Sequence, residues 1–140
     1  DQSSATGLSA DSRGIEADNN QTNPLLTPIS NPTLSNVTLI GRGLANVAKE
    51  GGIWLRRGTH ATISNVYIAN FSSTASGSGF GINFDGTDSQ NFFTANPLTN
   101  ITITGVTTPS NMAAGFNATT TATGAGNGAT KPSWMNWMGL

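Results

Sequence analysis

The chain has 140 residues, enough for one domain, and its 6 basic and 7 acidic residues give a net charge of −1. This balance provides no basic patch for nucleic acid or for an anionic membrane surface. The absence of cysteine excludes disulfides and thiolate metal sites, and no apolar run approaches the ~20 residues of a membrane-spanning helix.

Two kinds of apolar segment alternate along the chain, each with the period-2 pattern of a β-strand. The first kind begins with glycine and isoleucine or a similar pair, at residues 14–18, 52–56 and 81–85. The second kind places an asparagine between apolar residues, at residues 33–39, 62–68 and 97–103. Only 9% of the residues are charged, and Gly, Thr, Asn and Ser dominate, which is typical of secreted β-solenoids.

The spacing between the two kinds of segment is constant on one side. Val37 and Ile53 are 16 residues apart, and Val66 and Ile82 are again 16 apart. The connections on the other side range from 13 to 22 residues, so we expect loops of different lengths there. One side of each repeat is therefore fixed, and the other side carries the variation.

A repeat of 29 residues, from Val37 to Val66, predicts an all-β fold, a right-handed parallel β-helix (a solenoid) of about three to four coils. No stretch has the apolar stripe of an amphipathic helix, so we expect no long helix. Phe116, 15 residues after Ile101, is interpreted as a degraded fourth glycine-led segment. A sandwich of hairpins is the alternative, but only Asp85-Gly86 has the composition of a hairpin turn.

Asn36, Asn65 and Asn100 occupy the same place in the three asparagine-centred segments. We expect each at a sharp corner with left-handed backbone, which asparagine tolerates better than other residues with a side chain. Stacked at ~4.8 Å, the three amides can hydrogen-bond to one another along the solenoid. We therefore predict a structural asparagine ladder rather than a set of ligands.

Two outward-facing columns are predicted on the glycine-led strands. In chain order they are Glu16, Trp54 and Asn83, and Asp18, Arg56 and Asp85. The second column places opposite charges one strand spacing apart, which predicts a ladder of cross-strand ion pairs.

The same columns admit two functional interpretations. Trp54 could stack on a sugar ring, with Glu16 and Arg56 beside it as polar contacts. Asp18 and Asp85, at roughly 9.6 Å by the strand spacing, could be the acid pair of a polysaccharide lyase or hydrolase. Because Arg56 between them would hold both carboxylates ionised, we expect no enzyme activity.

His60 is the only histidine, and it has neither a second imidazole nor an acidic cluster near it in sequence. We predict no metal site and no cofactor. Asp85 and Asp88 are too few carboxylates for the about six to eight oxygens of a calcium site, so we predict a plain turn.

We divide the chain into β-helix coils at residues 1–106, with an irregular start at 1–11, and a tail at 107–140. The tail is rich in Gly, Thr and Ala and ends in an apolar segment that contains Trp134, Met135, Trp137 and Met138. We expect this segment to form an irregular aromatic cap over an open coil edge, or to offer an interface to a partner.

Residues 11–20, 30–41 and 52–59 together resemble the C-terminal part of a family of exported bacterial proteins with right-handed β-helix repeats. This resemblance extends over about residues 11–105. It implies an extracellular or outer-membrane surface location and a long upstream β-helical region, but no established reaction and no catalytic residues. Without such upstream coils, we expect a fragment of a larger protein, a neighbouring chain at the edge, or a fibre of stacked copies.

Our prediction is a non-catalytic structural role, in which the chain stacks on further coils or on copies of itself. The alternatives are a carbohydrate-binding module that uses Trp54 with Asp18, Arg56 and Asp85, and a fragment of a polysaccharide lyase or hydrolase. The expected partner is the chain itself or the upstream part of the same protein, with a glycan as the alternative. We expect neither nucleic acid nor a membrane span.

Overall fold

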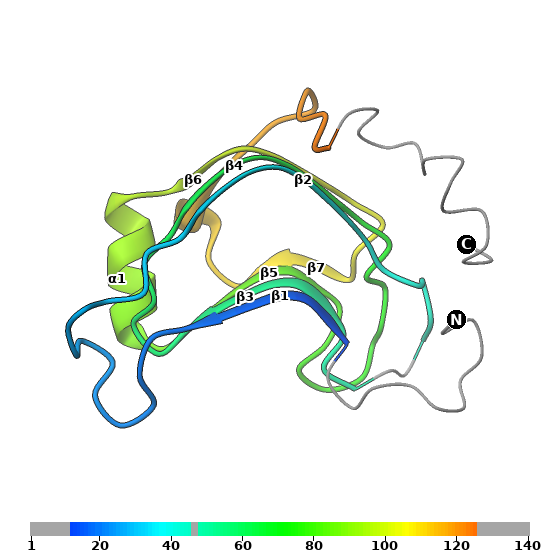
Figure 1. Ribbon diagram of the computed structural model, residues 1–140. Coiled ribbons are helices and arrows are strands. Elements are labelled where there is room, and N and C mark those ends of the chain that lie inside the picture. Colours follow the sequence, from blue (N-terminus) through cyan, green and yellow to red (C-terminus); the bar gives the residue numbers. More distant parts are fainter. Residues whose placement is uncertain (1–11, 46–47, 126–140) are drawn as a thin grey trace.

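The computed structural model describes residues 12–45 and 48–125, which form short strands wound into coils (Figure 1). The elements are β1 (Arg13–Asp18), β2 (Thr33–Ile40), β3 (Gly51–Arg56), β4 (Thr62–Ala69), β5 (Phe80–Asp85), α1 (Thr87–Ala95), β6 (Leu98–Thr104), β7 (Thr108–Ser110), a 3-10 helix (Ala113–Gly115) and β8 (Phe116–Ala118). Strand follows strand with α1 as the one α-helix among these residues.

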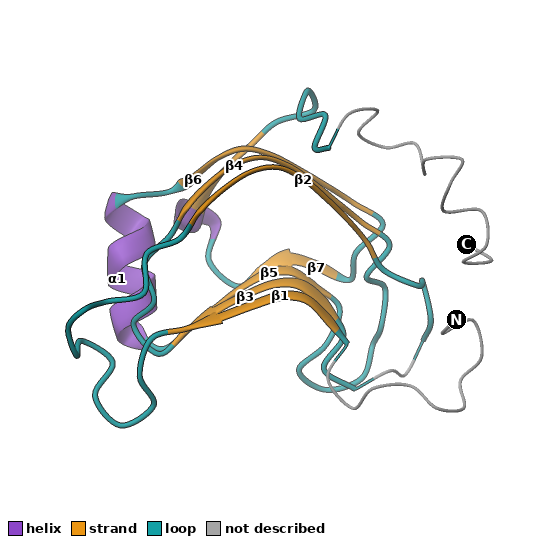
Figure 2. Cartoon of the chain, in the orientation of Figure 1, coloured by secondary structure: helices purple, strands orange, loops and turns teal. Residues whose placement is uncertain are grey.

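The strands form two sheets that face each other (Figure 2). One sheet has the order β1-β3-β5-β7 and the other β2-β4-β6-β8, and all neighbours pair in parallel. Because successive strands alternate between the sheets, β1 with β2 is the first coil, and β7 with β8 is the fourth. The fold is therefore the predicted parallel β-helix of about four coils.

The register between coils is the one that the sequence spacing predicts. The inward columns are Ile15, Ile53 and Ile82 in one sheet, and Val37, Val66 and Ile101 in the other. The glycine that precedes the inward isoleucine has a packing role as well. A Cβ atom on Gly52 would lie 2.5 Å from the Gly81 carbonyl oxygen and 2.7 Å from Cγ2 of Ile68, a side chain of the facing sheet. This position therefore has no room for a side chain.

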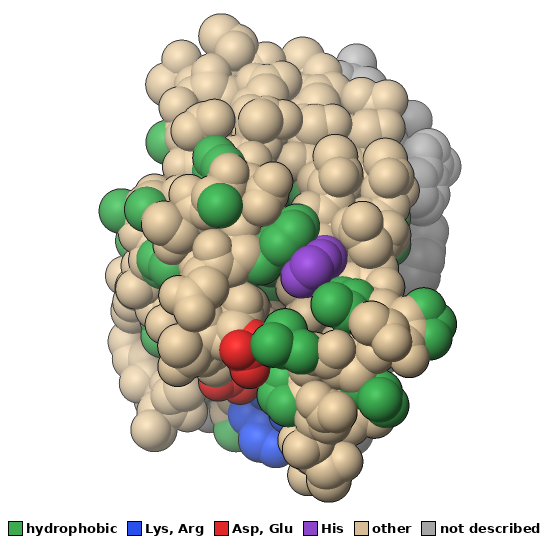
Figure 3. Space-filling view, turned by 90° about the vertical axis from the view of Figure 1, so that its left-hand side faces the viewer, with side chains coloured by type: hydrophobic (Ala, Val, Ile, Leu, Met, Phe, Trp, Pro, Cys, Tyr) green, Lys and Arg blue, Asp and Glu red, His purple; other side chains and the backbone are tan. Residues whose placement is uncertain are grey.

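Helix α1 is a feature that the sequence pattern did not predict. It starts after Gly86, whose φ of 89° turns the chain out of β5. Phe93 is fully buried and packs on Phe84 with 5.2 Å between ring centroids. The helix covers the side of the solenoid that Figure 3 faces. Within residues 12–45 and 48–125, no helix is long and apolar enough to cross a membrane.

The fourth coil corrects the interpretation of Phe116. The strand that continues the glycine-led sheet is β7, in which Thr108 pairs with Phe80 and Ser110 with Ile82. Phe116 lies instead in the other sheet, opposite Leu98. The spacing count failed because the fourth coil is shorter than the others, and its glycine-led strand lacks the Gly-Ile signature.

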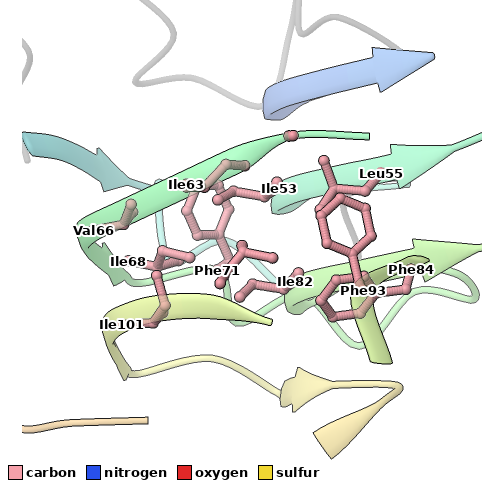
Figure 4. Close-up of a cluster of buried hydrophobic side chains, with 12 residues drawn as sticks. Ile53, Leu55, Ile63, Val66, Ile68, Phe71, Ile82, Phe84, Phe93 and Ile101 are labelled. Atoms are coloured by element: carbon pink, nitrogen blue, oxygen red, sulfur yellow. The ribbon is translucent and has the colours of Figure 1, made fainter. Parts of the chain in front are cut away.

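The core runs along the solenoid axis between the two sheets (Figure 4). The residues that are 0% exposed are Ile53, Leu55, Val66, Ile68, Ile82, Phe84, Phe93 and Ile101. They come from the second and third coils and from α1. Burial of this apolar surface is the main stabilising contribution to the fold.

Candidate functional site

The asparagine ladder is present and has a direction. Asn36, Asn65 and Asn100 have φ values of 58°, 52° and 54°, so all three adopt the predicted left-handed backbone. Asn100 Nδ2 donates to Asn65 Oδ1 (3.1 Å), and Asn65 Nδ2 donates to Asn36 Oδ1 (2.7 Å). Each amide therefore donates toward the preceding coil, and Asn36 Nδ2 has no acceptor within residues 12–45 and 48–125.

The outward charged column forms in the predicted register, with Arg56 paired to Asp18 on one side and to Asp85 on the other. Arg56 Nε lies 3.2 Å from Asp18 Oδ1 and 3.8 Å from Asp85 Oδ2, which confirms the expected ion pairs. Arg56 also bonds to Glu16 in the neighbouring column. One guanidinium thus contacts three carboxylates.

Two further arginines join this network that the sequence analysis did not assign to it. Arg13 bonds to Glu16, and Arg57 Nη1 lies 2.7 Å from Asp18 Oδ2. Arg57 is displaced from the alternating pattern, since its φ is 56°. The strand alternation therefore gave no signal that its side chain returns to the column.

The charges of the column oppose acid catalysis. Partial burial acts to raise the pKa of Glu16, but hydrogen bonds and the positive charges of Arg13 and Arg56 together lower it below its ordinary value. A general acid needs the opposite shift. Every carboxylate of the column is in addition within 4 Å of a guanidinium.

Trp54 faces outward, as its column predicts, but the expectation that it lies in solvent is wrong. It is 6% exposed. The Arg13 guanidinium lies 4.4 Å from the centre of its ring, and Phe80 packs edge-on at 5.6 Å. Gly51 provides the space, since a Cβ there would lie 2.4 Å from the indole. The ring face that a sugar would need is already occupied by a cation.

His60 stacks on a helix side chain. Its ring lies parallel to Phe92 of α1, with 3.7 Å between centroids and 8° between planes. Figure 3 shows the histidine flanked by hydrophobic side chains. Asp85 and Asp88 lie at the start of the same helix, so the segment predicted as a plain turn leads directly into α1. Within the described ranges, no three His, Cys, Asp or Glu side chains are grouped so as to hold a metal ion.

Glu50 is a buried carboxyl group that the sequence analysis missed. It is 1% exposed. Burial raises the pKa of Glu50, and this effect outweighs the nearby backbone amides of Arg42 and Ser73 and the Arg42 charge. Glu50 precedes the buried strand β3, and its position in a variable connection gave no burial signal.

Glu50 and Glu16 should give opposite pH dependences of stability. Because the folded-state pKa of Glu50 is raised, its contribution is complete below the ordinary value of 4.5 and is lost as pH rises through the folded value. The lowered pKa of Glu16 gives a contribution that is present above 4.5 and is lost as pH falls. Urea unfolding from acidic to neutral pH should show that Glu50→Gln gains stability relative to wild type as pH rises, whereas Glu16→Gln loses it. Equal slopes for the two variants would contradict this assignment.

The end of the first coil differs from the middle of the solenoid. Five inward side chains there are only partly buried: Ile15, Ala17, Leu34, Val37 and Leu39. Their partners in register in the second coil are at most 2% exposed: Ile53, Leu55, Ile63, Val66 and Ile68. Strands β1 and β2 are also the last strands of their sheets, so each has one edge that no other described strand pairs. We call this surface the first-coil end.

The predicted cap residues Trp134, Met135, Trp137 and Met138 lie outside the described residues. At the opposite end of the solenoid, β7 and β8 are three residues each, against six and eight in β1 and β2. The first-coil end is thus the end with full-length strand edges.

Comparison with protein families gives one match to this geometry. The family of pectate-lyase-like β-helix domains matches residues 3–138. Comparison with curated proteins gave no match, and comparison with solved structures gave none.

Proposed function

The chain belongs to the family of pectate-lyase-like β-helix domains, and from this premise we propose that it is a non-catalytic structural module. It acts by stacking its first-coil end on further parallel coils or on the same end of a second copy. In keeping with its resemblance to exported β-helix proteins, we place it outside the cell, in the medium or on the outer-membrane surface.

The observation that carries this proposal is the incomplete burial of the first coil. The contrast between Leu34, which is partly exposed, and Ile63, its partner at 2%, repeats at four more positions of the same two coils. Burying an aliphatic side chain fully contributes about 1.5–3 kcal/mol, so covering five partly buried ones is strongly favourable. One further coil would complete the column at each position.

The polar groups of the first-coil end favour the same kind of partner. The edges of β1 and β2 offer backbone donors and acceptors to another strand. Asn36 Nδ2 offers the next donor of the ladder, at the place where a preceding coil would present an amide oxygen. A strand-edged, apolar partner satisfies all three features at once.

The outward charged column supports a structural rather than a catalytic role. Arg13, Arg56 and Arg57 together neutralise Glu16 and Asp18, and Arg13 occupies the face of Trp54. These side chains satisfy one another. The column therefore gives weaker support to the glycan-binding and polysaccharide-cleaving alternatives than the first-coil end gives to stacking.

Substitution of Leu34 tests the proposal. We expect the full chain to associate as its concentration rises in analytical ultracentrifugation, and Leu34→Asp to weaken this association by about tenfold or more, because a carboxylate would be buried in the contact. Thr33→Asp is the matched control: it adds the same charge to the same strand, but on the outward, exposed side.

Circular dichroism and urea unfolding of both variants separate loss of association from loss of fold. A wild-type chain that is monomeric at every concentration, with or without its C-terminal segment, would contradict the proposal. So would equal association of the Leu34→Asp and Thr33→Asp proteins.

A further inference from the structure

Residues 119–125 cross the outside of the asparagine-bearing sheet, and we call this segment the strap. It lies above β6, β4 and β2 in Figure 1, where it is orange. The Thr119 amide donates to the Ile101 carbonyl at 2.8 Å, in the third coil. The Thr123 amide donates to Asn65 Oδ1 at 3.0 Å in the second coil, and the Ala125 amide donates to Thr38 Oγ1 at 2.9 Å in the first. The strap therefore runs from the third coil to the first.

Close packing fixes the strap where it meets the first coil. Gly124 has a φ of 59°, and a Cβ on it would lie 2.2 Å from Thr38 Oγ1 and 2.8 Å from the Val37 carbonyl oxygen. Tyr67, which faces outward from β4, is 8% exposed, and its Cβ lies 3.1 Å from the same point. The chain thus leaves the described region beside β2.

The sequence beyond the strap matches the surface that it approaches. Trp134 is nine residues past Ala125, and nine residues reach at most about 30 Å. The first-coil end, with Leu34, Val37 and Leu39 partly exposed, begins at the strand that Ala125 touches. Tryptophan supplies large apolar area, and methionine adapts to irregular apolar surfaces.

We propose that the C-terminal segment of the chain, through Trp134, Met135, Trp137 and Met138, covers the first-coil end and competes there with stacking. This inference rests on the proposed function, because it takes the first-coil end as the stacking surface. The strap selects this end over the fourth coil, since each of its contacts is one coil closer to β2. The segment then acts as an internal competitor that keeps the chain from associating before its partner is present.

Cross-linking tests the location of the segment. Because the chain has no cysteine, Ser35→Cys with Asn136→Cys creates a single pair for a short bismaleimide. Thr99→Cys with Asn136→Cys is the matched control, because Thr99 is in register with Ser64 and Ser64 with Ser35, two coils apart on the same sheet. Cross-linking within monomers should be at least about tenfold faster for the first pair, whose separation is shorter by two strand spacings, about 10 Å. Equal rates, or a faster control pair, would overturn the inference.

Truncation after Ala125 tests the competition. We expect self-association of the truncated chain to be at least about tenfold tighter than that of the full chain. Association of the full chain that is unchanged or weakened by truncation would overturn the inference and leave the proposed function standing. Selective cross-linking at Ser35 without association of either protein would support the segment's location and overturn the proposed function.

Discussion

Replacing Asn65 by alanine is expected to lower the free energy of unfolding by about 3–4 kcal/mol. Its side chain links three parts of the molecule: Nδ2 donates to Asn36, and Oδ1 accepts from Asn100 and from the backbone amide of Thr123. Each lost hydrogen bond costs about 1 kcal/mol. The left-handed backbone at φ 52° adds about 1–2 kcal/mol for a residue with a Cβ and no local hydrogen bond.

Two companion variants separate these contributions in urea unfolding. Asn65→Gly loses the same hydrogen bonds but enters the left-handed region freely, so it should be about 1 kcal/mol more stable than Asn65→Ala. Asn100→Ala removes only the bond to Asn65 from the ladder and should cost less than Asn65→Ala. An Asn65→Ala protein within about 0.5 kcal/mol of wild type would show that the ladder does not stabilise the fold.

Replacing Gly52 by alanine should cost about 3 kcal/mol, the second large effect. The new Cβ would lie 2.5 Å from the Gly81 carbonyl oxygen and 2.7 Å from Ile68 Cγ2. The first neighbour is backbone in the paired strand β5, so it cannot turn away, and the clash must separate two coils or shift the facing sheet.

Gly77→Ala is the control for this variant. Gly77 has a φ of 69°, but no atom lies within 4 Å of the position that its Cβ would take, so its substitution tests backbone strain alone, about 1–2 kcal/mol. Thermal and urea unfolding should therefore rank Gly52→Ala well below Gly77→Ala in stability. The reverse order would mean that the coils can separate at little cost.

The regular part of the fold could be predicted because its signal is repeated. The pairing of Val37 with Val66 follows from the repeat, and the left-handed backbone at Asn36 follows from the place of asparagine in that repeat. The charged column followed from the same alignment, and Arg56 contacts Asp18 and Asp85 as expected. Periodic positions report both pairing and face.

The features that could not be predicted are those that occur once. Helix α1 packs through the adjacent residues Phe92 and Phe93, which have no helical spacing. The burial of Trp54 depends on Arg13, a neighbour from another coil, and on the missing side chain of Gly51. The path of the strap is fixed by single contacts such as Ala125 with Thr38, which no repeat announces. These contacts depend on the packing of distant segments rather than on a local pattern.

The direction of the asparagine ladder gives the molecule a polarity like that of a filament with unlike ends. At Asn36 the ladder ends in an unused donor, whereas beyond Asn100 the register between β6 and β8 is irregular from Leu98 to Ile101, and no further asparagine bonds to Asn100 among the described residues. A rod built on this chain could therefore lengthen only from the β1 and β2 side. The chain would set where such a rod stops, and the length of the assembly would be finite rather than open.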